Sequence, residues 1–325
     1  MHFLARLLLI VSLTVMTMTT RAASLTVRIK DTDYVRMTEW ARWQGLQARW
    51  IKRDENFTLT NAAAKIQFEV SSREARFNGI QLWLLYPLVS RGGDIYISQL
   101  DIDSTFRPLL AAPRNDAGKK LKVICLDAGH GGKDPGNRAM GRQEKDYTLR
   151  LVGELRNQLQ KAGFKVVFTR TSDRFIELSD RADIARQRGA DLFVSIHFNA
   201  TESGKDQARG SEVYCMTPTG AASTNARGEG SSSGASAGNK NNAKNLLLAY
   251  QIQKSLVKNL DSEDRGVRRA RFEVLREATM PATLIEAGFL THPTEGKKIF
   301  TEEYRRQMAK AITEGVMSYK RVVER

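Results

Sequence analysis

The stretch KVICLDAGHGGKDPG, residues 122–136, decides the fold of the larger part of this 325-residue chain. A short apolar run passes directly into a loop with four glycines, and an amphipathic segment follows. This order is typical of the first strand, loop and helix of an α/β sheet. Clustered glycines mark a tight turn or a close approach of the backbone to a ligand. Packing explains the turn, but it leaves the histidine of this loop, His130, unexplained.

Downstream of this loop, helix-like and strand-like segments alternate to the end of the chain. Residues 265–272, RGVRRARF, interrupt the alternation and are expected to be a basic loop. Residues 121–325 therefore predict an α/β domain with helices on both faces of its sheet. The periodicity predicts helices over residues 144–161, 178–189, 245–260 and 302–323, and strands over residues 122–126, 165–170, 191–199, 211–216, 272–275 and 282–289.

The residues before this domain have a different pattern. Residues 24–110 combine short strand-like runs with one helix-like piece around residues 37–44, which predicts a small α+β module. Residues 111–120 are polar and contain Pro, Gly and Asn, so we expect a linker there. Within the larger domain, residues 217–242 are rich in Gly and Ser, and we expect them to form a flexible insert.

The first residues carry the pattern of a secretory signal peptide. Arg6 precedes an apolar run over residues 7–18, and small residues around Ala22 suit a cleavage site, so residues 1–22 are expected to be removed. The run is shorter than the roughly 20 residues that span a bilayer, which argues against an uncleaved anchor. We expect an extracytoplasmic protein of the periplasm or cell envelope, with no stable membrane span after cleavage.

The charge and the cysteines limit the partners and the chemistry. A formal net charge of +15 favours a polyanionic partner. No nucleic-acid-binding signature is present, so an anionic polymer or membrane surface of the cell envelope is expected instead of nucleic acid. Cys125 and Cys215 lie inside apolar strand-like runs. Although export permits a disulfide, we expect both to be buried small hydrophobes without a nucleophilic role.

Two histidines and two glutamates stand where chemistry is expected. His130 and His197 each follow or end an apolar strand, so both should reach the sheet edge where open α/β sheets bind ligands. Glu144 begins the helix after the glycine loop, and Glu286 ends a five-residue apolar run in which a charge needs a partner. Two histidines and one carboxylate suit one zinc ion with an open fourth position, and the spare carboxylate can accept a proton from water.

Four motifs then resemble a known family over residues 120–325. The resemblance to the zinc-dependent N-acetylmuramoyl-L-alanine amidases rests on LDAGHGGKDPG, EKD, SIHFNA and DRGVRRARFEVLREATMPATLIEAGFL, in this order and spacing. It implies a sheet of about six strands flanked by helices. It also implies that His130, Glu144 and His197 bind zinc and that Glu286 is the catalytic carboxylate. The implied substrate is peptidoglycan, cleaved between N-acetylmuramic acid and the L-alanine of the stem peptide.

Further expectations are less specific. Arg268 and Arg269 in the basic loop, together with Asn199, are candidates for substrate binding, although a solvated basic loop is an equal alternative. The departures from the family pattern, Ala128 for a proline and His292 for an asparagine, do not affect the four site residues. Residues 24–110 resemble the copper amine oxidase N-terminal-like domain, which implies a non-catalytic module that could bind the cell wall. A regulatory protein partner is also a candidate.

Two other functions remain open from the sequence. One is a zinc peptidase or deacylase that acts on another amide, although the H-E-x-x-H motif of many zinc proteases is absent. The other is a non-enzymatic protein that binds the cell wall through a decayed catalytic fold. The loss of a ligand or of Glu286 would favour the second, and all four residues are present.

Overall fold

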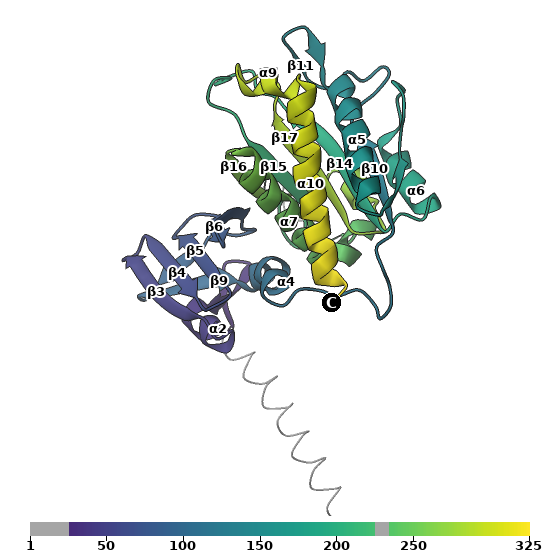
Figure 1. Cartoon of the computed structure of the whole chain (residues 1–325). Coiled ribbons are helices and arrows are strands. Elements are labelled where there is room, and N and C mark those ends of the chain that lie inside the picture. The colour runs from purple at the N-terminus through teal and green to yellow at the C-terminus, as the bar shows by residue number, and fades with distance from the viewer. Residues whose placement is uncertain (1–25, 225–233) are drawn as a thin grey trace, which may run out of the picture.

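The computed structural model describes residues 26–224 and 234–325, and it has the α/β architecture expected from the sequence (Figure 1). The predicted leader, residues 1–22, lies outside the described residues, as does the middle of the predicted insert, residues 217–242. In the part of the chain that is described, no helix has the length and apolar character needed to cross a membrane.

The larger domain contributes six strands to one sheet, as the family resemblance implies. Four neighbouring strands of this sheet are parallel, β15 runs antiparallel to β17, and β16 runs parallel to β15. The spatial order is β13 (Lys165–Phe168), β10 (Val123–Ala128), β14 (Leu192–Asn199), β17 (Ala282–Phe289), β15 (Ser211–Met216) and β16 (Asp264–Ala270).

Helices cover both faces of this sheet. Three long helices, α5 (Glu144–Lys161), α7 (Asn242–Leu260) and α10 (Glu302–Val323), pack together on one face, and Figure 1 shows α5 and α10 crossing in front of the strands. The shorter helices α6 (Leu178–Gln187) and α8 (Glu273–Arg276) pack on the other face. Alternate strand residues serve the two layers: Ile285 joins the core under the long helices, and Leu284 joins the smaller core under α6 and α8.

The remaining short elements lie in connections: β11 (Arg138–Ala139) and β12 (Arg142–Gln143) form a hairpin, η2 (Ala237–Asn241) precedes α7, and α9 (Glu295–Ile299) precedes α10. His292, which departs from the family pattern, is buried and accepts the backbone N–H of Glu295 at the start of α9. Cys125 and Cys215 are buried and free, as expected.

Two neighbouring segments differ from the prediction. The run FEVL, predicted as a strand, contains the start of helix α8, in which Phe272 O accepts the backbone N–H of Leu275 and of Arg276 at 2.9 Å. Short apolar runs do not distinguish a strand from a buried helical turn. The predicted basic loop instead forms β16, because the charge of Arg269 is buried against acceptors inside the protein.

The N-terminal module is a small α+β unit, as predicted. Its strands form a four-stranded sheet, in the order β1-β2-β9-β8, and an antiparallel meander from β3 to β7. The elements are β1 (Thr26–Ile29), β2 (Thr32–Arg36), α2 (Met37–Trp43), β3 (Gln47–Lys52), β4 (Asn56–Thr60), β5 (Lys65–Glu69), β6 (Glu74–Phe77), β7 (Ile80–Trp83), β8 (Val89–Arg91), β9 (Asp94–Ser98), α3 (Gln99–Asp101), η1 (Ile102–Phe106) and α4 (Arg107–Leu110).

The two parts of the chain share one sheet, which the sequence did not predict. Leu82 of β7 lies beside Val267 of β16, so the meander extends the sheet of the larger domain to eleven strands. Trp83 Nε1 donates to Arg265 O at 2.9 Å, and the Arg269 guanidinium donates to Ser104 O at 2.7 Å. The N-terminal module is therefore packed against the larger domain through backbone pairing and buried polar contacts.

Candidate metal centre and active site

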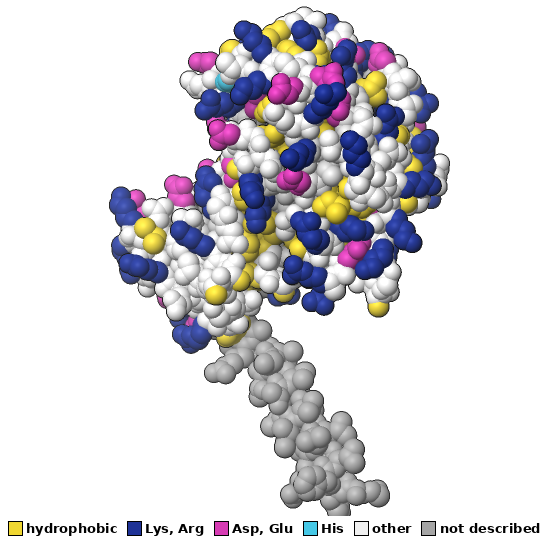
Figure 2. Space-filling view, viewed as in Figure 1, with side chains coloured by type: hydrophobic (Ala, Val, Ile, Leu, Met, Phe, Trp, Pro, Cys, Tyr) yellow, Lys and Arg dark blue, Asp and Glu magenta, His cyan; other side chains and the backbone are white. Residues whose placement is uncertain are grey.

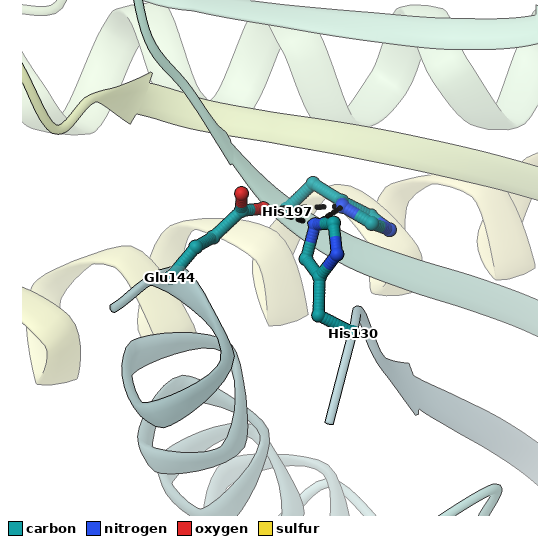
Figure 3. A group of neighbouring side chains, drawn as sticks. All are labelled: His130, Glu144 and His197. Carbon is teal, nitrogen blue, oxygen red and sulfur yellow. Dashed lines mark hydrogen bonds and ion pairs between the residues drawn. The ribbon is translucent and has the colours of Figure 1, made fainter. Parts of the chain in front are cut away.

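Three side chains from three different elements meet at the C-terminal ends of the central parallel strands (Figure 3). His130 comes from the loop after β10, Glu144 is the first residue of α5, and His197 lies near the end of β14. His197 Nδ1 is 3.2 Å from His130 Nε2 and 3.1 Å from Glu144 Oε1, and His130 Nε2 is 3.1 Å from Glu144 Oε1. The structure thus brings together the three side chains that the sequence analysis named as candidate zinc ligands.

The glycines of the loop make room for this arrangement. His130 itself has a left-handed backbone, with φ 62°. A Cβ at Gly129 would overlap the His197 ring, and a Cβ at Gly136 would come within 2.6 Å of the His130 ring and 2.7 Å of Glu144 Oε2. Glycine at positions 129 and 136 therefore leaves free the space around the three candidate ligand atoms, which a Cβ would fill.

A second layer of contacts fixes the orientation of these side chains. Asp134 Oδ2 lies 2.7 Å from His130 Nδ1, so the proton on Nδ1 is held there and Nε2 directs its lone pair toward the centre. Glu144 Oε2 accepts the backbone and side-chain N–H groups of Asn137, each at 2.9 Å, and Oε1 accepts the Phe198 N–H at 3.0 Å. The site is therefore pre-formed.

The electrostatics of the triad favour a cation. Burial alone would raise the pKa of Glu144, but hydrogen bonds and charge interactions with His130 and His197 outweigh it and lower that pKa. Burial alone would lower the pKa of His130, but Glu144 and Asp134 outweigh it and raise that pKa. The carboxylate is thus stabilised in its charged form, and positive charge is favoured beside it.

The donor set also has the right size for zinc. Zinc bonds of about 2.0–2.1 Å in a tetrahedron place neighbouring ligand atoms about 3.3 Å apart. The three distances between the ligand atoms here are 3.1, 3.1 and 3.2 Å. The spacing of two imidazole nitrogens and one carboxylate oxygen therefore fits three protein ligands of a zinc ion.

Glu286 lies beside this centre on β17. Its backbone is paired with that of His197 on one side and with that of Glu212 on the other. Its Oε2 is buried and has no hydrogen-bond partner among the described residues. Burial, followed by the charges of Glu144 and Glu212, raises the pKa of Glu286 well above the usual range. A buried carboxyl group with a raised pKa beside a candidate metal site is a candidate for a functional residue.

Glu212 is a buried acid that the sequence analysis missed. Its Oε1 accepts from Asn199 Nδ2 at 2.7 Å and from the Tyr214 hydroxyl at 2.8 Å. Its Oε2 forms ion pairs with Arg268 Nε at 2.7 Å and Arg265 Nε at 3.3 Å. The one signal in the sequence was a single carboxylate inside the apolar run SEVYCM.

The three candidate substrate-binding residues have different surroundings. Asn199 and Arg268 both contact Glu212, and the Arg268 guanidinium lies 4.3 Å from the centroid of the Trp83 ring of the N-terminal module. Arg269 is only 1% exposed, and its guanidinium donates hydrogen bonds to Ser104 O and Thr105 Oγ1. Asn199 and Arg268 thus lie near Glu286, whereas the placement of Arg269 favours a structural role.

Comparisons with known proteins point to one family. A family model described as N-acetylmuramoyl-L-alanine amidase matches residues 124–318. The chain is 39% identical over 230 residues to the N-acetylmuramoyl-L-alanine amidase AmiC of Neisseria meningitidis, a match covering 64% of this chain and 55% of that protein. It is 33% identical over 231 residues to AmiA of Escherichia coli, covering 63% and 78%. A solved N-acetylmuramoyl-L-alanine amidase from Clostridium difficile is similar, with 37% identity, TM-score 0.52, and coverage of 62% and 97%.

Proposed function

The chain belongs to the N-acetylmuramoyl-L-alanine amidase family and is a hydrolase of that class, and from this premise we propose that it cleaves peptidoglycan at the triad of His130, Glu144 and His197. The bond cleaved is the amide between N-acetylmuramic acid and the L-alanine of the stem peptide. The observation that carries the proposal is the close approach of three potential ligand atoms, 3.1–3.2 Å apart, beside the orphaned carboxyl group of Glu286.

One zinc ion is the proposed cofactor, held by His130 Nε2, Glu144 Oε1 and His197 Nδ1. When bound there, zinc supplies a Lewis acid that polarises a carbonyl group and makes water more acidic. The chain contributes the orientation of the ligands, because Asp134 fixes the His130 ring and Asn137 fixes the Glu144 carboxylate.

Glu286 is the proposed general base and then the general acid. Its carboxylate accepts a proton as a water oxygen bonds to the lactyl carbonyl carbon. The same carboxyl group returns the proton to the alanine nitrogen as the C–N bond breaks, so the products are a free carboxyl group and a free amine. Its Oε2 suits this role because it has no hydrogen-bond partner among the described residues. Burial raises the pKa of Glu286, and a cation bound nearby would lower that pKa again.

The setting of the reaction is also part of the proposal. The predicted leader directs the protein out of the cytoplasm and into the compartment that contains peptidoglycan. Lys and Arg side chains are spread over the visible surface of both parts of the molecule (Figure 2), which suits an anionic wall polymer. Asn199 and Arg268 are the proposed contacts for the substrate. A regulatory protein partner remains a prediction from the sequence.

The direct test is digestion of purified peptidoglycan followed by mass spectrometry of the soluble products. We expect free stem peptides that begin at L-alanine, produced only when metal is present and absent with Glu286→Gln. Cleavage within the stem peptide would instead support the zinc peptidase alternative. Binding without any product, in the presence of zinc, would support the wall-binding alternative and overturn the proposed activity.

A further inference from the structure

A row of polar side chains crosses the sheet of the N-terminal module. Thr58 of β4 is paired with Gln67 of β5, Gln67 with Arg76 of β6, and Arg76 with Gln81 of β7. Residues directly opposite one another on neighbouring strands point to the same face of a sheet. The alternate residues on these strands, such as Phe68, belong to the hydrophobic core on the other side. The polar row therefore belongs to the outer face of the module.

This outer face is hollowed. The four residues of the row line a groove of about 340 Å³, with Asn56 and Glu74 among its other lining residues. Thr58 and Gln81 are only 5% and 8% exposed, although they point away from the apolar core. In the described parts of the chain, the side chains of Thr58 and Gln67 form no hydrogen bond. The Arg76 guanidinium donates to Gln81 Oε1 at 3.4 Å, so Thr58 is the member of the row that is both shielded and without a hydrogen-bond partner among the described residues. A shielded polar group of this kind in a concave site is suited to hold a ligand.

The same face of the sheet carries the candidate active site. Val267 and Leu82 are paired and both belong to the inner core, so their neighbours Arg268, Gln81 and Trp83 point to the opposite face. On that face Arg268 contacts Glu212, and the backbone of Glu212 is paired with that of Glu286. Seven strand spacings separate β14, which carries His197, from β4. At about 4.8 Å each, the distance measured across the sheet is about 34 Å.

The junction between the two parts keeps this face continuous. Gly266 of β16 has φ 88°, and a Cβ there would lie 3.0 Å from Gln81 O and 3.1 Å from Trp83 Cδ1. Glycine therefore leaves no side chain between the active-site half and the module half of the face. Beside this point the Arg268 guanidinium lies 4.3 Å from the centroid of the Trp83 ring.

We propose that this groove binds the glycan strand of the polymer whose stem peptide the active site cleaves, an inference that rests on the proposed function. Amide, hydroxyl and guanidinium groups can hydrogen-bond to sugar hydroxyl and N-acetyl groups. The groove lies on a sheet face where the backbone groups of β4 to β7 already pair with one another. Side chains must therefore recognise the ligand, which disfavours an extended peptide that adds as a strand.

The first experiment measures binding without catalysis. In a Glu286→Gln background, co-sedimentation with purified peptidoglycan compares Gln67→Trp, which fills the groove, with Gln160→Trp on the exposed side of α5. We expect about tenfold weaker binding for the groove variant and no change for the control. Thr58→Val keeps the side-chain shape and removes the hydroxyl, so it should weaken binding if the fold is intact. Unchanged binding by both groove variants would overturn the proposal.

Competition identifies the part of the polymer that is bound. Glycan strands stripped of peptide should displace the protein from peptidoglycan, and free stem peptides should not. Displacement by peptides alone would overturn the glycan assignment.

Kinetics separate this inference from the proposed function. With Glu286 present, Gln67→Trp should raise KM for polymeric peptidoglycan about tenfold and leave kcat/KM for a short soluble muramyl peptide unchanged. An equal loss on both substrates would overturn a separate binding surface. If the unmodified protein cleaves neither substrate yet still binds through the groove, the proposed function fails and the binding surface stands.

Discussion

Glu212 and Glu286 lie directly opposite one another on antiparallel strands, and their side chains have opposite surroundings. Glu212 is held by Asn199, Tyr214, Arg265 and Arg268, whereas Glu286 has a buried oxygen with no partner among the described residues. Two like charges at such positions repel. Burial, then the charge of Glu144 and then that of Glu212 raise the pKa of Glu286. Glu212 thus holds neighbouring side chains in place, whereas Glu286 is the proposed proton acceptor.

Replacement of Glu286 should separate metal binding from turnover. Glu286→Gln keeps the side-chain size and removes the proton acceptor, so we expect turnover to fall about 10²- to 10⁴-fold. Bound zinc, measured by mass spectrometry of the metal, should remain at one per chain. Glu277→Gln, in an exposed ion pair, is the control and should keep full activity. Activity of Glu286→Gln within tenfold of the unmodified protein would refute the assigned role.

Asp134 should control metal affinity without being a ligand. Asp134→Asn weakens the contact that orients His130, and such changes typically lower metal affinity about 10- to 100-fold. Titration of zinc against a competing chelator measures this loss. Asp183→Asn changes an exposed acid on α6 and should have no effect. An affinity equal to that of the unmodified protein would show that Asp134 does not orient the ligand.

Substitutions of Arg268 and Glu212, which form an ion pair, should have strongly coupled effects on the free energy of unfolding. Arg268→Ala leaves a buried carboxylate with fewer partners, so we expect the free energy of unfolding to fall by about 3 kcal/mol. Adding Glu212→Gln should recover part of this loss, and a double-mutant cycle in urea measures the coupling. Arg276→Ala breaks an exposed pair and should cost less than about 1 kcal/mol. A coupling energy near zero would contradict the description of this pair.

Acid stability should depend on Asp127. Asp127 is fully buried and accepts from Arg181, Thr169 and Ser195. Burial would raise its pKa, but Arg181 and the two hydroxyl groups outweigh burial and lower it. The unfolded chain therefore takes up this proton at a higher pH than the folded protein does. The resulting stabilisation is complete above about pH 5 and is lost progressively as pH falls through the unfolded pKa toward the lower folded pKa.

Thermal unfolding between pH 7 and pH 3 tests this expectation. Asp127→Asn should be less stable at pH 7 and should lose less further stability on acidification than the unmodified protein does. Parallel profiles for the two proteins would mean that other carboxyl groups dominate the acid response.

The sequence predicted the parts of the fold that depend on local pattern. Apolar periodicity and the placement of glycines predicted that helix α5 begins at Glu144, that His130 follows a strand and that His197 lies near the end of one. Strand β16 was mistaken for a basic loop because the acceptors that bury Arg269 lie about 165 residues away in the chain. Glu212 was missed for the same reason, since its partners come from three separate segments.

The pairing of β7 with β16 has a consequence for any shortened form of the protein. A chain that begins after the predicted linker, residues 111–120, would lack β7 and leave β16 as an open edge. Open edge strands present unpaired backbone groups that recruit other chains and promote aggregation. It would also leave the buried guanidinium of Arg269 without its acceptors on Ser104 and Thr105. The N-terminal module thus covers the edge strand of the larger domain and protects it from pairing with other chains.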